Sequence, residues 1–345
     1  MGKGQKLILA ALVSFACICA ASSLGSSRIN PLDTLRIILG RTGGQNPRDI
    51  SIVLQLRLPR VLLAFMAGGA LALSGAVFQA ALKNQLASPY IIGLSSGASL
   101  GAALVILCGL RLPLLGPLLG PLLGPLLGSL TLPLAGFGAG LLTVLFVIAF
   151  SARLDRNMSN NTVILFGLVV SLFVNALLTT LMAFFREELK TLILWQMGSF
   201  ALKGWSSVFM LLPFLVLGGL GLMRYSRELD LLSFGEEESQ AAGLELRRVR
   251  VLLFLLASLL SGAVVALCGA IGFVDLAAPH AGRRITGPGH RWVLPMSFLT
   301  GGCLMTAADL AARTIISPSE LPVGAVTALL GAPFFAWMYF RRGRP

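Results

Sequence analysis

Residues 251–271 have the sequence VLLFLLASLLSGAVVALCGAI, which contains no charged side chain. A helix needs about 20 predominantly apolar residues to cross the hydrocarbon core of a bilayer. Residues 7–25 and 163–185 are two further uncharged runs of this kind. In lipid, only helices and closed barrels satisfy every backbone polar group, and runs that are apolar on all faces favour the helix. These three stretches therefore predict an all-α, polytopic membrane protein.

The composition of the whole chain agrees with a membrane location. Of its 345 residues, 56% are hydrophobic and only 12% are charged, whereas about 25% of an ordinary soluble protein is charged. Apolar surface in such excess must face membrane lipid. The net charge of +13 comes from lysines and arginines in short loops between the apolar runs. They form no basic stripe with stacking aromatics, so nucleic acid is not expected as a partner.

The residue types that usually carry catalysis or bind metal form no recognisable cluster in the sequence. The five cysteines lie in apolar runs without a CxxC pair, and the two histidines have no cysteine or carboxylate neighbours at ligand spacing. We therefore expect no metal site and no cofactor. The chain also lacks a GxxxxGK[ST] phosphate loop, so we expect that it does not hydrolyse ATP itself.

Ten apolar segments are expected to cross the membrane, within one domain over residues 1–345. They are 7–25, 58–82, 91–110, 130–150, 162–185, 205–223, 248–270, 272–286, 292–316 and 323–340. An even number places both termini on one side, and the bias of lysine and arginine makes that side the cytoplasm. The N-terminus also looks like a signal peptide, but no A-x-A site follows, so an uncleaved first helix is expected.

Two segments between the spans are unusual. Residues 113–128 repeat PLLG, and because a proline every fourth residue removes helical hydrogen bonds, we expect an outside connection and no ordinary helix. Residues 224–250 form the largest polar island. There we expect two short helices broken at Gly243, where a residue without Cβ permits a tight turn, and a solvated loop is the alternative.

Four stretches match one known family in order and spacing: 57–104, 233–244, 269–295 and 308–338. They contain the motifs RLPR, SSGA, GFV followed by PH, and ELPVG followed by GAP. With these motifs the chain closely resembles the permeases of ABC importers for ferric siderophores, haem and cobalamin. It departs from that family at Gln85, Asp275 and Gly289. Asp275, at membrane depth, is expected to neighbour a basic residue, to line the path, or to lie at a tolerant loop edge.

The resemblance implies a ten-helix subunit that works as a dimer around a central pathway. A second copy of the chain is the expected partner, and the sequence leaves a close paralogue open. A dimer of ATP-binding subunits would lie on the cytoplasmic side of the inner membrane, and a substrate-binding protein on the other side. The implied function is ATP-driven import of an iron chelate or cobalamin. The residues alone leave open a membrane-embedded lipid-modifying enzyme or a secondary transporter.

Arginines at the outer end of the membrane domain are the implied docking residues for the binding protein: Arg57, Arg60 and Arg313. Asp309 lies four residues before Arg313, and residues at this spacing are neighbours on a helix, so Asp309 is expected to orient Arg313. The positive-inside tendency disfavours basic residues outside, which calls for a partner there. Arginine heads held in the lipid headgroups are the alternative.

Two further sets of residues are implied at the cytoplasmic end. The gate consists of the turn after the second span and the loop before the fifth: Asn84, Gln85, Leu86, Asn160 and Asn161. Helix capping is the alternative for these polar side chains. Coupling to the ATPase is expected within 228–250, of which 228–246 would pack into a groove on that partner. Its named residues are Glu236, Glu237, Gly243 and Leu244.

Overall fold

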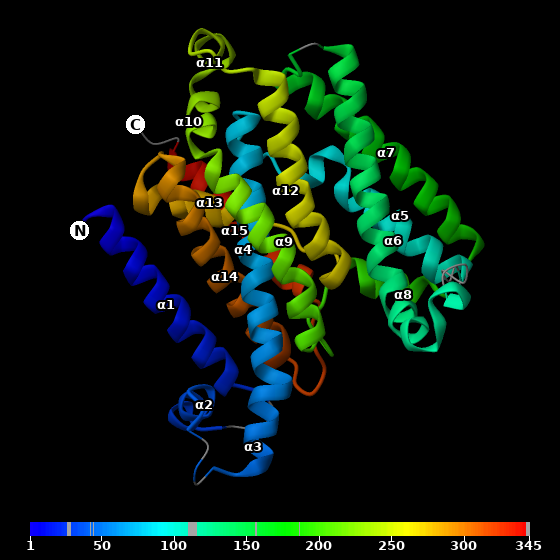
Figure 1. Cartoon of the computed structure of the whole chain (residues 1–345), viewed down its shortest axis with the longest axis vertical. Helices are drawn as coiled ribbons and strands as arrows, with labels where there is room; N and C mark the ends of the chain where they lie inside the picture. The colour runs from blue at the N-terminus through cyan, green and yellow to red at the C-terminus, as the bar shows by residue number, and fades with distance from the viewer. Residues whose placement is uncertain are drawn as a thin grey trace.

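A computed structural model describes residues 1–25, 29–41, 43, 45–109, 116–155, 157–185 and 187–342. Within these ranges the chain is helical and contains no strand (Figure 1). The helices are α1 (Lys3–Ser23), α2 (Pro31–Ile38), α3 (Pro47–Ser51), η1 (Ile52–Arg57), α4 (Leu58–Ala81), η2 (Pro89–Ile92), α5 (Leu94–Cys108), α6 (Gly116–Leu154), α7 (Asn160–Phe184), α8 (Leu189–Gln196), α9 (Trp205–Arg224), α10 (Ser226–Phe234), α11 (Glu236–Ala241), α12 (Leu246–Cys268), α13 (Val274–Thr286), α14 (His290–Thr314) and α15 (Val323–Arg342).

Each of the ten expected spans falls on a helix, and the all-α prediction is confirmed. Among the described residues, 7 helices are long and apolar enough to cross a membrane. These are α1, the continuous rod from α3 to α4, the Leu130–Leu154 part of α6, α7, α9, α12 and α14. The apolar helix α5 and the start of α15 are shorter, and α13 has 13 residues. The number of complete crossings therefore stays a prediction.

Helix α4 runs through the centre of the bundle, where α9, α12, α13 and α14 surround it. Every residue from Leu63 to Ala81 is buried. Small residues allow this packing because they let helix backbones approach closely. A Cβ atom at Gly68 would collide with the carbonyl oxygen of Gly301 on α14, and one at Gly75 with that of Asp275 on α13.

Helices α5, α6 and α7 form a second layer, which lies on the right in Figure 1. The buried residues of α7 follow a single stripe: Val163, Gly167, Val170, Val174 and Leu178. Leucines between these positions, such as Leu165 and Leu172, are exposed in the isolated chain. An exposed apolar face of this width is expected where a helix faces lipid or a second subunit.

The expectation of no helix over the PLLG repeat is wrong for the part that the structure describes. Helix α6 begins at Gly116 and includes the prolines at 117, 121 and 125. Each proline removes only its own N–H donor, so three residues in four can still donate helical hydrogen bonds. The first proline lies in the first turn of the helix, where an N–H would have no helical acceptor in any case. Residues 113–115 lie outside the described part of the chain.

Two breaks in the helices meet in the middle of the bundle. The chain between α4 and α5 turns back through η2 and enters α5 at Gly93, whose φ is 83°. The chain between α12 and α13 passes Phe273, whose φ is 69°. The Tyr90 hydroxyl donates to the carbonyl of Ile271 across this junction at 2.7 Å. Irregular backbone at membrane depth is tolerated where protein buries it in this way.

Candidate functional site

The polar island at 224–250 forms two short helices, as expected, at one end of the molecule (Figure 1). The break between α10 and α11 lies at Gly235, whose φ is 153°, so the prediction that the break lies at Gly243 is wrong. Gly243, with a φ of 84°, instead ends the turn that leads into α12. Leu244 closes this turn by donating its N–H to Ser239 and packs on the core.

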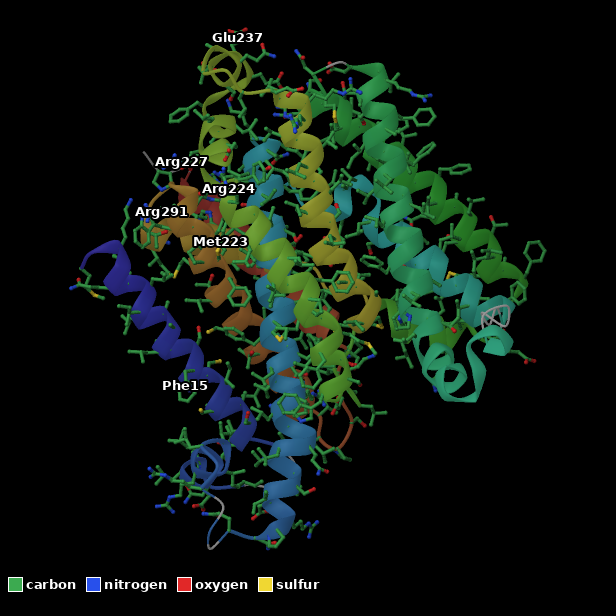
Figure 2. The ribbon with its side chains drawn as sticks, viewed as in Figure 1. Phe15, Met223, Arg224, Arg227, Glu237 and Arg291 are labelled. Atoms are coloured by element: carbon green, nitrogen blue, oxygen red, sulfur yellow. The ribbon has the colours of Figure 1, made fainter. Side chains whose placement is uncertain are left out.

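The two coupling glutamates have different surroundings. Glu237 is exposed at the tip of α11, as Figure 2 shows. Glu236 faces inward and forms an ion pair with Arg250, whose Nη2 lies 2.9 Å from Glu236 Oε1. The exposed tip therefore offers charge to a partner, while the inward glutamate ties α11 to the start of α12.

Arg250 is a buried charged residue of this region that the sequence did not single out as a site residue. It is among the largest fully buried side chains of the described chain and is 1% exposed. Its Nη1 donates at 2.9 Å to the carbonyls of Asn157 and Met158, and its Nη2 donates to Asn160 Oδ1 at 3.1 Å. One guanidinium thus joins the coupling helix to the expected gate loop.

The turn after α4 holds the other residues that were expected to form the gate. Asn84 accepts from the N–H of Leu86 at 2.9 Å, which is a turn-forming role, while Gln85 and Leu86 are exposed. Lys83 precedes them with a φ of 46° and donates to the carbonyl of Phe234, the last residue of α10, at 2.9 Å. This gate segment is therefore also tied to the coupling region.

The loop before α7 is shaped by Asp155. Its carboxylate accepts from the N–H groups of Asn157 and Ser159, both at 2.9 Å. Hydrogen bonds from Ser159, first through its side chain, lower the pKa of Asp155 to about 2. Asn160 and the exposed Asn161 lie inside the helix, and Asn160 Oδ1 accepts from Arg250, so the capping alternative does not describe Asn160.

A third contact ties α10 to α14. Asp230 Oδ1 accepts from both the backbone N–H and Nδ1 of His290, at 2.8 and 2.7 Å. His290 is the first residue of α14, and its N-cap Gly289 has no side chain to satisfy the helix N-terminus. Asp230 supplies the missing carboxylate, which is favourable at the positive end of a helix.

The three arginines that were expected to dock the binding protein lie near the opposite end of the molecule, close to α2 and α3. Arg57 is only 6% exposed, and its Nη1 donates to the carbonyl of Ser23 at 2.7 Å. Arg313 donates through Nη2 to the carbonyl of Ala21 at 2.6 Å. Both arginines thus hold the carboxyl end of α1. They are covered by protein, so the alternative of heads held in lipid headgroups does not describe them.

Asp309 and Glu320 bind Arg60 from two sides. Arg60 Nη2 lies 2.8 Å from Asp309 Oδ1, and Nη1 lies 2.7 Å from Glu320 Oε1. Arg313 Nε lies 3.7 Å from Asp309 Oδ2, so the expected pair between them is present, but Asp309 is bound more closely by Arg60. The hydrogen bond from Arg60 lowers the pKa of Glu320.

A cavity of about 440 Å³ opens at this cluster. Its lining contains four arginines and one glutamate: Arg48, Arg57, Arg60, Arg313 and Glu320. Arg48 is the exposed arginine of the set, and Glu320 is exposed as well. With more cationic than anionic groups, the cavity favours an anionic group such as a carboxylate.

Asp275 is buried, with 1% exposure, near the two helix breaks. Ser88, in the turn that leads to η2, donates its hydroxyl to Asp275 Oδ2. Gln79 donates to the carbonyl of Asp275 at 3.3 Å and accepts from Arg283. The basic residue Arg283 is therefore linked to Asp275 through Gln79, and the Asp275 carboxylate connects α13 to Ser88 at the start of η2.

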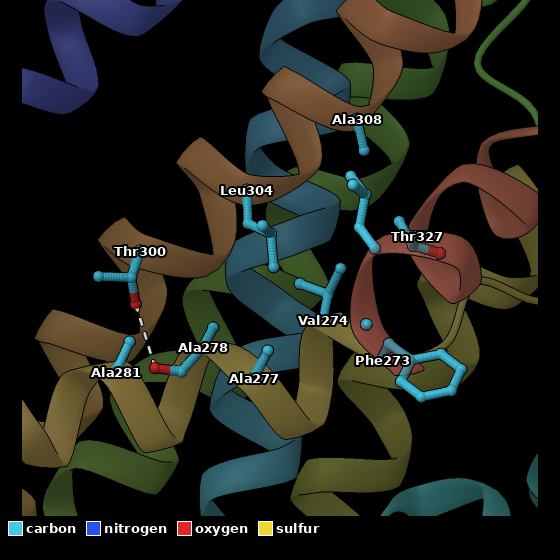
Figure 3. Close-up of a pocket in the computed structure, with 11 residues that line it drawn as sticks. Phe273, Val274, Ala277, Ala278, Ala281, Thr300, Leu304, Ala308 and Thr327 are labelled. Carbon is cyan, nitrogen blue, oxygen red and sulfur yellow. Dashed lines mark hydrogen bonds between the residues drawn. The ribbon is translucent and has the colours of Figure 1, made fainter. Parts of the chain in front are cut away.

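A second cavity, of about 320 Å³, lies between α13, α14 and α15 (Figure 3). Ala278, Leu304 and Leu330 are among its lining residues, and Thr300 donates to the carbonyl of Ala278 at 3.3 Å. None of its eleven lining residues is charged. Unlike the cavity lined by the arginines, this one offers no charged side chain that could bind a polar ligand or partner.

Comparison with known proteins identifies the family. The model of the FecCD transport family matches residues 11–341. The hemin transport system permease protein HmuU of Yersinia pestis is 36% identical and covers 98% of this chain and 96% of that protein. The cobalamin import system permease protein BtuC of Halobacterium salinarum is 37% identical over 83% of this chain and 73% of that protein.

Structural comparison agrees with the sequence match. A solved metal-chelate type ABC transporter in an inward-facing conformation is 29% identical, with a TM-score of 0.84 over 98% of this chain and 99% of that one. Family, relatives and fold therefore agree over nearly the whole length. The chain belongs to the FecCD transport family and is a multi-pass membrane permease subunit of an ABC importer.

Proposed function

We propose that this permease imports an iron chelate, haem or cobalamin across the cytoplasmic membrane, driven by a separate ATPase. One observation carries the proposal: Lys83 and Arg250 connect the expected coupling region to both expected gate segments by hydrogen bonds. A region that an ATPase can move therefore reaches the gate directly. The names of the relatives support the cargo class, and among them are also permeases for ferric citrate and molybdate.

The ATPase is proposed to bind α10 and α11. Glu237 projects from the tip of this region, and Arg224, Arg227 and Arg291 lie in the same half of the molecule in Figure 2. Basic residues are typical of the cytoplasmic side of a membrane protein. Helix α1 begins and α15 ends in the same half of the molecule (Figure 1). Both termini are therefore proposed to lie in the cytoplasm, with a dimer of ATPase subunits beneath.

The extracytoplasmic binding protein is proposed to dock at the arginine cavity. Arg57, Arg60 and Arg313 shape the cavity from within the chain, and the exposed Arg48 lies at its rim. A carboxylate from each lobe of the binding protein would enter one such cavity in each of two permease copies. Complementary charge of this kind sets docking register and on-rate more than affinity.

The test is reconstitution in liposomes with the ATPase and the binding protein that the same cell makes. Uptake of a ferric siderophore, haemin, cobalamin or molybdate is measured with and without ATP. ATP-dependent uptake of one of the first three is expected. Uptake driven by a proton or sodium gradient without ATP would instead identify a secondary transporter. ATP-dependent uptake of molybdate alone would contradict the proposed cargo.

A further inference from the structure

We propose that Arg250 is a positioning residue that transmits movement of α11 to the gate loop before α7. This inference rests on the proposed roles of these two segments. Arg250 contacts both of them at once, through Glu236 Oε1 on α11 and through Asn157, Met158 and Asn160 at the loop.

The geometry of the guanidinium makes the connection stiff. A guanidinium is planar, and its donors have fixed directions relative to each other. Nη1 is bound to two consecutive carbonyls, and Nη2 is shared between Asn160 and Glu236. A displacement of Glu236 therefore acts on the same rigid group that holds the loop. A lysine would offer a single ammonium on a flexible stem and would connect them less directly.

Burial keeps the connection intact. Arg250 is 1% exposed, so water cannot replace a lost partner. The Glu236 side chain is 33% exposed, so separating the pair would leave the uncompensated charge on the buried arginine, which is unfavourable. When α11 moves, it is therefore less costly for the loop to follow than for the pair with Glu236 to separate.

The loop is itself built to move as a unit. Asp155 binds the N–H groups of Asn157 and Ser159, which fixes the turn between α6 and α7. Met158 is fully buried with a φ of 52°, so it anchors the turn on the core. A pull on the carbonyls of this turn is thus passed on to the first residues of α7, where the expected gate lies.

Arg248 provides a matched control. It lies two residues away on the same helix, its side chain is 81% exposed, and it pairs with the exposed Glu245 at 3.9 Å. Replacing Arg248 with methionine removes the same charge from the same turn of α12. It leaves the contacts of α11 and the gate loop unchanged.

The experiment compares R250M, R250K and R248M in the reconstituted complex of permease, ATPase and binding protein. ATP hydrolysis and cargo uptake are measured in the same vesicles. For R250M we expect uptake per ATP to fall roughly tenfold or more, since charge-assisted hydrogen bonds at a buried site are lost. For R250K we expect uptake per ATP to lie between R250M and the wild type, and for R248M we expect it to equal the wild type.

A second measurement does not need transport. Hydrogen exchange in 155–160 and in α11 is compared with and without an ATP analogue in the complex. In the wild type and in R248M, the ATP analogue should change the hydrogen exchange of both segments. In R250M it should change the exchange of α11 alone. This comparison separates lost transmission from lost folding, because an unfolded variant would exchange throughout.

Two results would overturn the proposal: uptake per ATP in R250M equal to the wild type, or a gate loop that still responds to nucleotide in that variant. The double variant R250M/E236Q adds a further check, since residues on one path are not additive. Its uptake per ATP should be no lower than that of R250M alone. A wild-type complex without ATP-dependent uptake would refute the proposed function, and the exchange measurement would still decide the role of Arg250.

Discussion

Replacing Asp309 with alanine tests whether the outer arginine cluster is an internal ion network. Asp309 is 1% exposed and accepts from Arg60 at 2.8 and 3.1 Å, with Arg313 at 3.7 Å. Its removal leaves two buried arginines without the carboxylate they share. Breaking a buried pair in this way costs about 3–5 kcal/mol. The matched change is Glu320→Ala, because this partner of Arg60 is 36% exposed and such a pair contributes at most about 1 kcal/mol.

The assay is thermal unfolding of the purified permease in detergent, followed by intrinsic fluorescence and by size-exclusion. At roughly 2 °C per kcal/mol, Asp309→Ala should lower the midpoint by about 6–10 °C and Glu320→Ala by about 2 °C or less. Asp309→Leu combined with Arg60→Met should regain part of the loss, because an apolar pair of similar volume carries no unpaired charge. Equal shifts for the two single alanine variants would refute the network.

Three further predictions follow from the same contacts. Reporter fusions at Arg41 and at Arg342 should report opposite sides of the membrane, and the same side for both would contradict the proposed topology. Arg48→Glu should weaken binding-protein association and flatten its salt dependence, because less attraction remains to be screened, whereas Arg41→Glu outside the cavity is the control. Asp155 has a pKa of about 2 in the folded chain, below its value of about 4 when unfolded. Its hydrogen bonds should therefore stabilise the loop fully above about pH 5 and be lost as the pH falls through 2. Amide exchange of Ser159 in wild type and Asp155→Asn checks this, and identical pH profiles would exclude the role.

The membrane helices were predictable because lipid leaves the backbone few choices. An uncharged run such as 251–271 must form a helix, and the structure extends α12 only a few residues beyond it at the N-terminal end. The PLLG repeat was not predictable from a rule about single prolines. That rule describes a helix interior in water, whereas regularly spaced prolines in an apolar segment leave most helical hydrogen bonds in place.

The partners of the charged residues were the least predictable part. Arg57 is held by a carbonyl 34 residues earlier, and Arg60 by a carboxylate 260 residues later. The sequence shows which residues are charged and roughly how deep in the membrane they lie. It does not show which distant residues become their hydrogen-bond or ion-pair partners in the fold. For Arg250 a signal was present. It lies on the same helical face as Leu246, Leu253 and Phe254, all buried, so an inward-facing arginine was indicated by spacing.

The contacts at the two ends of the molecule share one structural element. Arg60 on α4 and Asp309 on α14 are paired at the end that is proposed to face outward, and Asp230 on α10 holds the first residue of α14 at the other end. Between these ends, Gly68 and Gly301 bring the two helices into backbone contact. If α4 slid along α14, larger side chains would move into the place of these glycines. They would clash there, because the interface is already closely packed. We therefore expect α4 and α14 to tilt as one body, so that docking at the arginine cavity and movement of α10 act on the same rigid pair.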